Sequence, residues 1–361
     1  MQNLNSTDLE NWYRLNKVAS LSGLRILFED IKPLIESCPF KTDLLGNSEN
    51  GLPIYKITLG NGSKKILMWS QMHGNESTGT KAVFDLLEFM NNPGAYRELV
   101  DGILKRCTIV IIPMLNPDGA IAYTRVNANN VDLNRDAVNQ SAVESKMLRK
   151  VLDEFKPQFC FNLHDQRTIF NVGDTNKPAT LSFLAPSEEV TRKITKGRTE
   201  TMSVIVAMNE FIQQLIPGQV GRYTDEFYPT ATGDNFQKLG YNTILIEAGH
   251  FEGDYEREIT RMFNFYALIK GLEFLATTND YLNFDSYFDI PNNGKQFFDI
   301  IYRNAAIDKN GSKNIMDLAI LFKYRVTNNR LERYEHVEKH GDLDGYFAHS
   351  EIDLARKYYN Q

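Results

Sequence analysis

Four short runs of apolar residues, each followed along the chain by a segment with helical spacing, constrain the fold of this sequence more than any other feature. The runs are continuous rather than alternating, and they cover residues 64–70, 107–114, 159–163 and 242–246. Strands that are apolar throughout are buried on both faces, as in a largely parallel sheet that lies between layers of helices. We therefore predict an α/β protein whose sheet is covered by helices over residues 78–90, 144–155, 199–216 and 256–275.

The two ends of the chain differ in pattern from this central part. Apolar residues recur with helical spacing over residues 7–37, whereas residues 297–302 and 318–326 have the composition of strands. Asn328 and Asn329 predict a hairpin turn after the second of these strands. We predict three parts: a helical N-terminal extension, a central α/β domain and a small β-rich accessory domain, at residues 1–45, 46–278 and 283–361.

Composition and charge argue against several classes of protein. The 361 residues carry a net charge of -6, which disfavours general affinity for nucleic acid or an anionic membrane. No apolar run approaches the roughly 20 residues of a membrane helix, and residues 1–8 lack the basic start and apolar core of a signal peptide. The three cysteines are scattered, so we expect free thiols in a cytoplasmic protein. None of these features indicates an oligomeric state.

Polar residues of metal-binding and catalytic types follow the apolar runs. His73 and Glu76 follow the first run, His164 directly follows the third, and Glu247 directly follows the fourth. Because the carboxyl ends of parallel strands meet at one edge of a sheet, we expect these side chains to lie together. Two histidines and one glutamate around an open fourth position are a known arrangement for a catalytic zinc ion. Imidazole nitrogens favour zinc over magnesium.

Three charged residues between the second and third runs extend this set. Asp132 could accept the free N–H of a metal-bound imidazole and so fix its tautomer. Arg125 and Arg135 supply fixed positive charge, of which one could pair with a substrate carboxylate and the other could stabilise a developing oxyanion. The alternative for each arginine is a surface ion pair.

The order of these motifs resembles the zinc metallocarboxypeptidase family, of the carboxypeptidase A type. The resemblance covers about residues 46–275 and rests on His73-x-x-Glu76, Asn116-Pro117-Asp118-Gly119, Asp132-Leu133-Asn134-Arg135, His164 and Glu247. It implies a mixed eight-stranded α/β sheet with helices on both faces and a catalytic domain at residues 46–278. It also implies zinc-dependent hydrolysis of an amide bond next to a free carboxylate, with removal of a C-terminal amino acid from a peptide as the expected reaction.

The resemblance further implies a role for each matched residue. One zinc ion per chain is expected on His73, Glu76 and His164, with Glu247 as the general base, Arg125 polarising the scissile carbonyl, and Asn134 and Arg135 binding the substrate carboxylate. In the family a mobile tyrosine that binds substrate precedes the base. Tyr228 is the first candidate for it and Tyr223 the second.

Two other functions stay open. The segments 73–76 and 132–135 also resemble the acyl-amino-acid deacylases of the aspartoacylase and succinylglutamate desuccinylase type, which use the same zinc chemistry on a small N-acyl amino acid. The segment 116–119 favours the carboxypeptidase, whereas the β-rich C-terminal part slightly favours the deacylase. A pseudoenzyme that binds peptides without cleaving them would lack a metal ligand or the base, and this sequence lacks neither.

The remaining motifs add no further chemistry. His336 and His340 are four residues apart but lack the glutamate that follows the first histidine of a zincin helix, so we expect a solvated segment. His250 is left without a role. The sequence contains no Gly-rich phosphate loop and no Gly-x-Ser-x-Gly motif, which argues against nucleotide use and serine hydrolysis.

Overall fold

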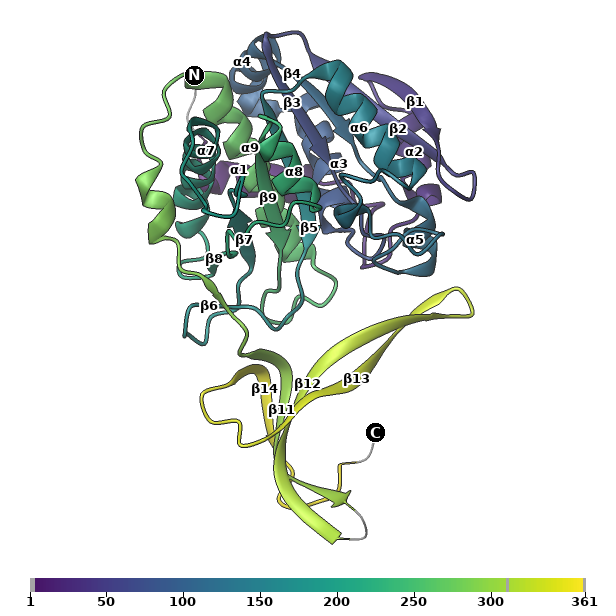
Figure 1. Ribbon diagram of the computed structural model, residues 1–361, viewed down its shortest axis with the longest axis vertical. Coiled ribbons are helices and arrows are strands. Elements are labelled where there is room, and N and C mark those ends of the chain that lie inside the picture. The colour runs from purple at the N-terminus through teal and green to yellow at the C-terminus, as the bar shows by residue number, and fades with distance from the viewer. Residues whose placement is uncertain (1–3, 310–311, 360–361) are drawn as a thin grey trace.

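An eight-stranded mixed sheet forms the centre of the computed structural model, which describes residues 4–309 and 312–359 (Figure 1). Its strands are β1 (Lys41–Asn47), β2 (Pro53–Gly60), β3 (Lys64–Trp69), β4 (Cys107–Ile112), β5 (Phe159–Asp165), β7 (Leu181–Leu184), β8 (Val220–Arg222) and β9 (Asn242–Ala248). They lie in the order β1-β2-β4-β3-β5-β9-β7-β8. The predicted mixed sheet of eight strands is therefore confirmed.

The four apolar runs form the parallel centre of this sheet. β4, β3, β5 and β9 are neighbours in that order and run parallel to one another. β3, β4 and β5 contribute to the core on both faces: in β3, Ile66 and Met68 pack on one side, and Leu67 and Trp69 pack on the other. β9 contributes Ile244, Ile246 and Ala248 to the larger core. The antiparallel pairings lie outside this centre, where β2 pairs with β4 and β7 pairs with β9.

Helices cover both faces of the sheet, as predicted. They are α1 (Ser6–Asn16), α2 (Phe28–Glu36), α3 (Thr78–Asn91), α4 (Arg97–Arg106), α5 (Pro117–Ala122), α6 (Val143–Phe155), α7 (Lys196–Gln213), α8 (Thr232–Lys238) and α9 (Glu258–Thr277), with short 3-10 helices at Gly94–Tyr96, Leu133–Arg135 and Asp285–Asp289. The larger core contains side chains of α1, α2, α3, α4, α7 and α9. The smaller core, on the opposite face, contains side chains of α6 and α8.

The N-terminal part differs from the helical extension that we predicted over residues 1–45, of which the first three lie outside the described residues. The helical spacing corresponds to two helices, α1 and α2, and residues 17–27 between them are not helical. The break arises because Lys17 turns to an extended conformation (ψ 147°) and Gly23 adopts a left-handed one (φ 79°). The edge strand β1 then begins at Lys41, inside the predicted extension.

The C-terminal part forms a separate four-stranded sheet, which confirms the expected β-rich region. Its strands are β11 (Phe297–Lys309), β12 (Ser312–Thr327), β13 (Arg330–Gly341) and β14 (Phe347–Asp353), in the order β13-β12-β11-β14. Asn328 and Asn329 join β12 to β13, and both have positive φ (51° and 62°), as in a type I′ hairpin turn. Residues 310–311 and 360–361 of the predicted domain at 283–361 lie outside the described residues.

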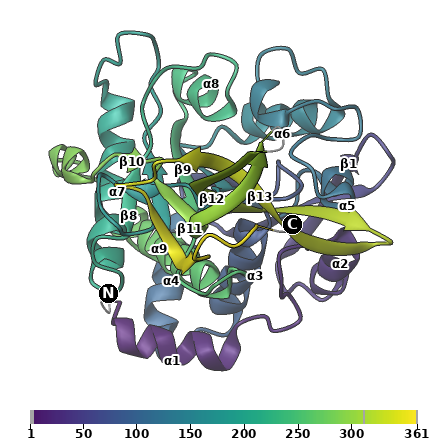
Figure 2. The same ribbon diagram turned by 90° about the horizontal axis from the view of Figure 1, so that it is seen from below.

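The C-terminal sheet packs against the loops that follow the central strands (Figure 2). Tyr324 of β12 contacts Tyr123, which directly follows α5 in the connection after β4, with ring centroids 6.1 Å apart. Phe322 of β12 contacts Tyr255, which follows β9, at 5.1 Å. A short two-stranded sheet of β6 (Asn171–Val172) and β10 (Asn293–Gly294) joins the two parts near the point where the chain passes from one to the other. The C-terminal sheet therefore lies over the carboxyl edge of the central sheet.

The cysteines and helices bear on the expectations about cellular location. Cys107 and Cys160 are buried free thiols, and Cys38 is a half-buried one. None of the helices in the described part of the chain is long and apolar enough to cross a membrane. The cytoplasmic location stays a prediction from the sequence.

Candidate metal and active site

β5 and β9 place His164 and Glu247 side by side at the carboxyl edge of the sheet. The two residues are register partners on neighbouring parallel strands, so their side chains leave the same face. Leu163, Ile246 and Ala248, which flank them, point into the core on the opposite face. His164 is buried and Glu247 is half-buried.

The loop between β3 and α3 carries His73 and Glu76 and is held in place by the start of α5. Gly74 approaches α5 so closely that a Cβ atom would lie 1.9 Å from the carbonyl carbon of Gly119. Asn116 donates from Nδ2 to a main-chain carbonyl of this loop at 3.1 Å and accepts from the Gly119 N–H at 2.8 Å. The Asn-Pro-Asp-Gly motif therefore supports the loop rather than touching the predicted ligands.

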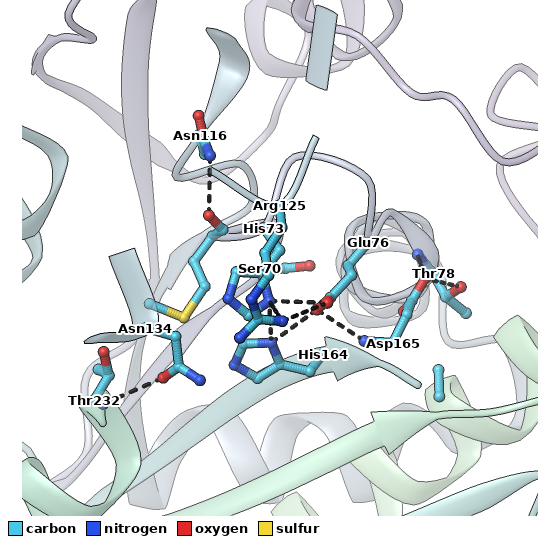
Figure 3. Close-up of polar contacts among 12 residues, drawn as sticks. Ser70, His73, Glu76, Thr78, Asn116, Arg125, Asn134, His164, Asp165 and Thr232 are labelled. Carbon is cyan, nitrogen blue, oxygen red and sulfur yellow. Dashed lines mark hydrogen bonds and ion pairs between the residues drawn. The ribbon is translucent and has the colours of Figure 1, made fainter. Parts of the chain in front are cut away.

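The three predicted metal ligands, His73, Glu76 and His164, converge on one point (Figure 3). The two carboxylate oxygens of Glu76 lie 2.8 Å from His73 Nδ1 and 2.8 Å from His164 Nδ1. The two Nδ1 atoms are 3.1 Å apart. Burial disfavours the ionised carboxylate of Glu76, but the two adjoining imidazoles hold its pKa well below the usual range.

Asp132 connects His73 to Arg125. One carboxylate oxygen lies 3.1 Å from His73 Nε2, and the other accepts from Arg125 Nε at 2.9 Å. Burial would raise the pKa of Asp132, but His73 and then Arg125 lower it below the usual range. Arg125 Nη1 also lies 3.2 Å from His73 Nδ1, so its guanidinium borders the cluster (Figure 3).

Asn134 and Arg135 lie next to the segment that contains Tyr228 and leads into α8. Asn134 Oδ1 accepts from the Thr232 N–H at 3.2 Å, at the start of α8. Arg135 is exposed, and its guanidinium lies 6.0 Å from the ring centroid of Tyr228. The Tyr228 hydroxyl donates to Glu226 Oε2 at 3.0 Å. Tyr228, which is 46% exposed, therefore lies beside the predicted carboxylate-binding arginine.

The second tyrosine candidate, Tyr223, occupies a different position. Its ring packs on Phe170, with centroids 5.1 Å apart. Burial raises the pKa of its hydroxyl well above the usual range, and the charges of Glu247 and Glu76 raise it further. Burial likewise raises the pKa of Glu247, with Glu76 and Asp165 as neighbouring negative charges.

Asp165 is a half-buried residue beside the predicted ligands, and no role was predicted for it from the sequence. Its Oδ2 accepts from the N–H and the hydroxyl of Thr78, at 3.2 and 2.7 Å, at the start of α3. Its own N–H donates to Glu76 Oε2 at 3.1 Å. Asp165 therefore fixes Glu76 relative to β5. Its position directly after His164 was the signal that could have indicated this role.

A cavity of about 310 Å³ lies next to Glu76, between the central sheet and the C-terminal sheet. Its wall includes Asp165 and Arg257 on one side and Phe322 and Tyr324 of β12 on the other. This contribution of the C-terminal part to the cavity was not predicted from the sequence.

More than half of the chain matches a known protein family. A family model described as zinc carboxypeptidase matches residues 31–235. The matched segment includes His73, Glu76 and His164, together with the residues at 125–135, but it ends before Glu247.

Individual relatives are similar over shorter segments. Carboxypeptidase 2 of Trichophyton rubrum is 28% identical over 105 residues, which are 28% of this chain and 19% of that protein. Gamma-D-glutamyl-L-diamino acid endopeptidase 1 of Lysinibacillus sphaericus is 36% identical over 100 residues, which are 26% of this chain and 25% of that protein. The chain thus spans about a fifth to a quarter of the length of these curated relatives.

Solved structures show the same fold. A metallo-carboxypeptidase from Burkholderia cenocepacia matches with a TM-score of 0.55 and 17% identity, over 68% of this chain and 67% of that chain. Carboxypeptidase A from Helicoverpa armigera matches with a TM-score of 0.55 and 14% identity, over 76% of this chain and 81% of that chain. With its fold and the match over residues 31–235, this chain belongs to the zinc carboxypeptidase family.

Proposed function

We propose that this protein is a zinc-dependent hydrolase that removes the C-terminal amino acid from a peptide. The observation that carries the proposal is the convergence of His73, Glu76 and His164 on one point at the carboxyl edge of the sheet. Two arginines, Arg125 and Arg135, follow on the adjoining segment and can bind an oxyanion and a carboxylate.

The three side chains fit one zinc ion. Nδ1 of His73 and Nδ1 of His164 are 3.1 Å apart, and neutral imidazoles that face each other through lone pairs repel unless a cation or a proton lies between them. Two imidazole nitrogens and a carboxylate also match the ligand types of catalytic zinc. When bound here, zinc would polarise the scissile carbonyl and lower the pKa of a water molecule.

Asp132 positions the residues on one side of the reacting carbonyl. By accepting from His73 Nε2–H, it leaves the Nδ1 lone pair directed at the metal position. By accepting from Arg125 Nε, it holds the guanidinium against the cluster, where the remaining N–H groups can donate to the oxygen that becomes negative during attack.

Glu247 acts as the general base and then as the general acid. As the register partner of His164, it faces the same point from the neighbouring strand. Its carboxylate accepts a proton from the attacking water and returns it to the nitrogen of the leaving amine, so one group serves as base and then as acid. Burial favours its neutral form, which makes it a better proton acceptor than an exposed carboxylate.

Asn134 and Arg135 select substrates that end near the scissile bond. Arg135 presents an exposed planar guanidinium that can pair bidentately with a carboxylate. Tyr228 lies against it and can cover the bound residue. We therefore expect the substrate to carry a free carboxylate on the residue that follows the scissile bond.

A second candidate is the deacylation of a small N-acyl amino acid. The same residues would bind its carboxylate, and the observation that favours it is the C-terminal sheet, which forms a wall of the cavity beside Glu76 and restricts its size. The similarity to an endopeptidase named for a γ-D-glutamyl-L-diamino acid adds γ-linked peptides to the substrates that should be compared.

The test is a hydrolysis screen of the zinc-loaded protein with matched substrates. A peptide, its C-terminal amide, a γ-glutamyl diamino-acid peptide and an N-acyl amino acid should be compared. Amidation should lower kcat/KM by at least about 100-fold, because Arg135 then loses its charged partner. Arg135→Met should remove this preference, whereas Arg97→Met, at an exposed position on α4, should retain it. Equal turnover of the acid and the amide would contradict the proposal.

A further inference from the structure

A second group of metal-ligand side chains lies where the C-terminal sheet packs on the end of β9. It consists of His250, two residues after β9, Asp299 of β11 and His349 of β14. One potential ligand atom from each residue lies within 4.8 Å of the others. His250 is 4% exposed and Asp299 is 2% exposed, whereas His349 is half-buried.

The polar atoms of this group are not satisfied by the protein. Both ring nitrogens of His250, Oδ1 of Asp299 and Nε2 of His349 are buried and have no hydrogen-bond partner in the structure. A buried polar atom without a partner costs about 1–3 kcal/mol. One atom from each of the three side chains could be satisfied by a single bound species.

The charge state of the group suits a cation. Burial lowers the pKa of His250 well below the usual range and that of His349 to about 4, so both rings are neutral at pH 7 and can offer a lone pair. The rings lie close together, with centroids 4.3 Å apart. A cation bound between the two rings would interact with a ring nitrogen of each, which otherwise has no hydrogen-bond partner.

Asp299 supplies the negative charge, and its surroundings fix its orientation. Its Oδ2 accepts from the Phe322 N–H at 2.7 Å, which holds the carboxyl group in place. Burial raises its pKa, while this hydrogen bond and the nearby hydroxyls of Thr168 and Tyr255 oppose the rise. A bound divalent cation would favour the ionised form further.

The guanidinium of Arg257 lies near this group, but its hydrogen bonds and its ion pair are with other residues. Its guanidinium donates to the main-chain carbonyls of Ala248 and Gln166, at 2.9 and 2.7 Å. It also lies 3.5 Å from Asp165, a carboxylate of the candidate active site. Arg257 therefore does not pair with Asp299 and leaves its carboxylate to another cation.

We propose that His250, Asp299 and His349 bind a second divalent transition-metal ion, of the class of zinc, which fastens the C-terminal sheet to the central sheet. Two imidazoles and one carboxylate are ligand types of zinc, and a water molecule would complete a tetrahedral site. The three ligands come from distant positions in the chain, so one ion closes two long loops.

The position of this site also bears on the cavity beside Glu76. His250 and Asp299 line that same cavity, so an ion held there would border it. By fixing β11 and β14, the ion would also hold Phe322 and Tyr324 of the adjacent strand β12 in the cavity wall. The inference does not depend on which amide bond the protein hydrolyses.

The test is the zinc content of the full-length protein, stripped with a chelator, reloaded and separated from free metal before elemental analysis. We expect two zinc ions per chain in the wild type. His349→Gln should retain one, at the first cluster, and His73→Gln should also retain one, at the second. His340→Gln, which changes an exposed histidine of β13, should retain two.

Thermal unfolding provides a second readout. It compares each variant with and without zinc, so a variant that is less stable than the wild type can still be used. Zinc at about 100 times its Kd should raise the Tm of His73→Gln by about 4 °C, and this rise should disappear when His349→Gln is added. One zinc ion in the wild type and none in His73→Gln would overturn the proposal, whether or not His349→Gln folds. Two ions in His349→Gln would overturn it as well.

Discussion

Asp132→Asn is the substitution that most directly tests how the candidate active site is held together. One oxygen of Asp132 accepts from His73 Nε2 and from the Asn134 N–H, and the other oxygen accepts from Arg125 Nε. The substitution keeps the size of the side chain but exchanges one oxygen for an N–H donor. Because the Asn134 N–H and His73 share one oxygen, we expect the amide oxygen to stay there. The new N–H would then face Arg125 Nε, and two donors cannot bond.

The expected magnitude follows from these contacts. A hydrogen bond between charged groups contributes roughly 1.5–3 kcal/mol when one partner is removed. Arg125 is 46% exposed, so solvent screens the pair, and we take about 1–1.5 kcal/mol, or roughly a 10-fold effect on kcat/KM. Zinc binding depends on the contact with His73, and loss of a charged partner of a metal-binding histidine weakens metal binding by about 10–100-fold.

The assay separates the two effects. The zinc Kd is measured by competition with a chromogenic chelator, and kcat/KM is then measured with zinc saturating for each variant. Asp153→Asn is the matched control, because the exposed Asp153 accepts from Arg149 on α6 at 2.9 and 2.8 Å and has no contact with the predicted ligands. It should change neither quantity.

The reasoning would be refuted if Asp132→Asn bound zinc and turned over substrate within about twofold of the wild type. A double-mutant cycle with Arg125→Met adds a further check. If Asp132 acts on the oxyanion only through Arg125, its effect on kcat/KM at saturating zinc should vanish once Arg125 is removed.

Two further predictions concern the proposed base and the buried support of the N-terminal segment. Glu247→Gln should lower kcat by about 100-fold to 10,000-fold while zinc content stays at the wild-type value; loss of zinc would make Glu247 a ligand, and full activity would remove it from the mechanism. Arg261→Met should lower the free energy of unfolding by about 3–5 kcal/mol in urea titrations, because it leaves the buried Asp85, bonded through both oxygens at 2.6 and 2.7 Å, without its cation. A loss below about 1 kcal/mol would contradict this account, and Arg97→Met serves as the exposed control.

The central strands were predictable because burial on both faces leaves a continuous apolar run. Strands β3, β4, β5 and β9 all have this pattern and all lie in the parallel centre. The edge strand β1 has only exposed and half-buried residues, and β7 and β8 are only four and three residues long. Their pattern is too weak or too short to distinguish them from loops.

The convergence of the predicted metal ligands followed from strand order, whereas the surroundings of the site did not. His73, Glu76 and His164 were expected together because parallel strands end at one edge. The contribution of Phe322 and Tyr324 to the cavity wall depends on how two sheets pack, and no local pattern encodes that contact. The same holds for His250, which lies beside Asp299 and His349 only because β11 and β14 pack against it.

The placement of Glu247 depends on the register of two strands more than on similarity to relatives, because the family match ends at residue 235. Side chains alternate along a strand, so a slip of one residue would turn Glu247 into the core that holds Ile246 and Ala248. Those two apolar residues therefore specify the register, and the register places Glu247 opposite His164. Burial of Ile246 and Ala248 on one face thus determines which carboxylate faces the predicted metal ligands on the other.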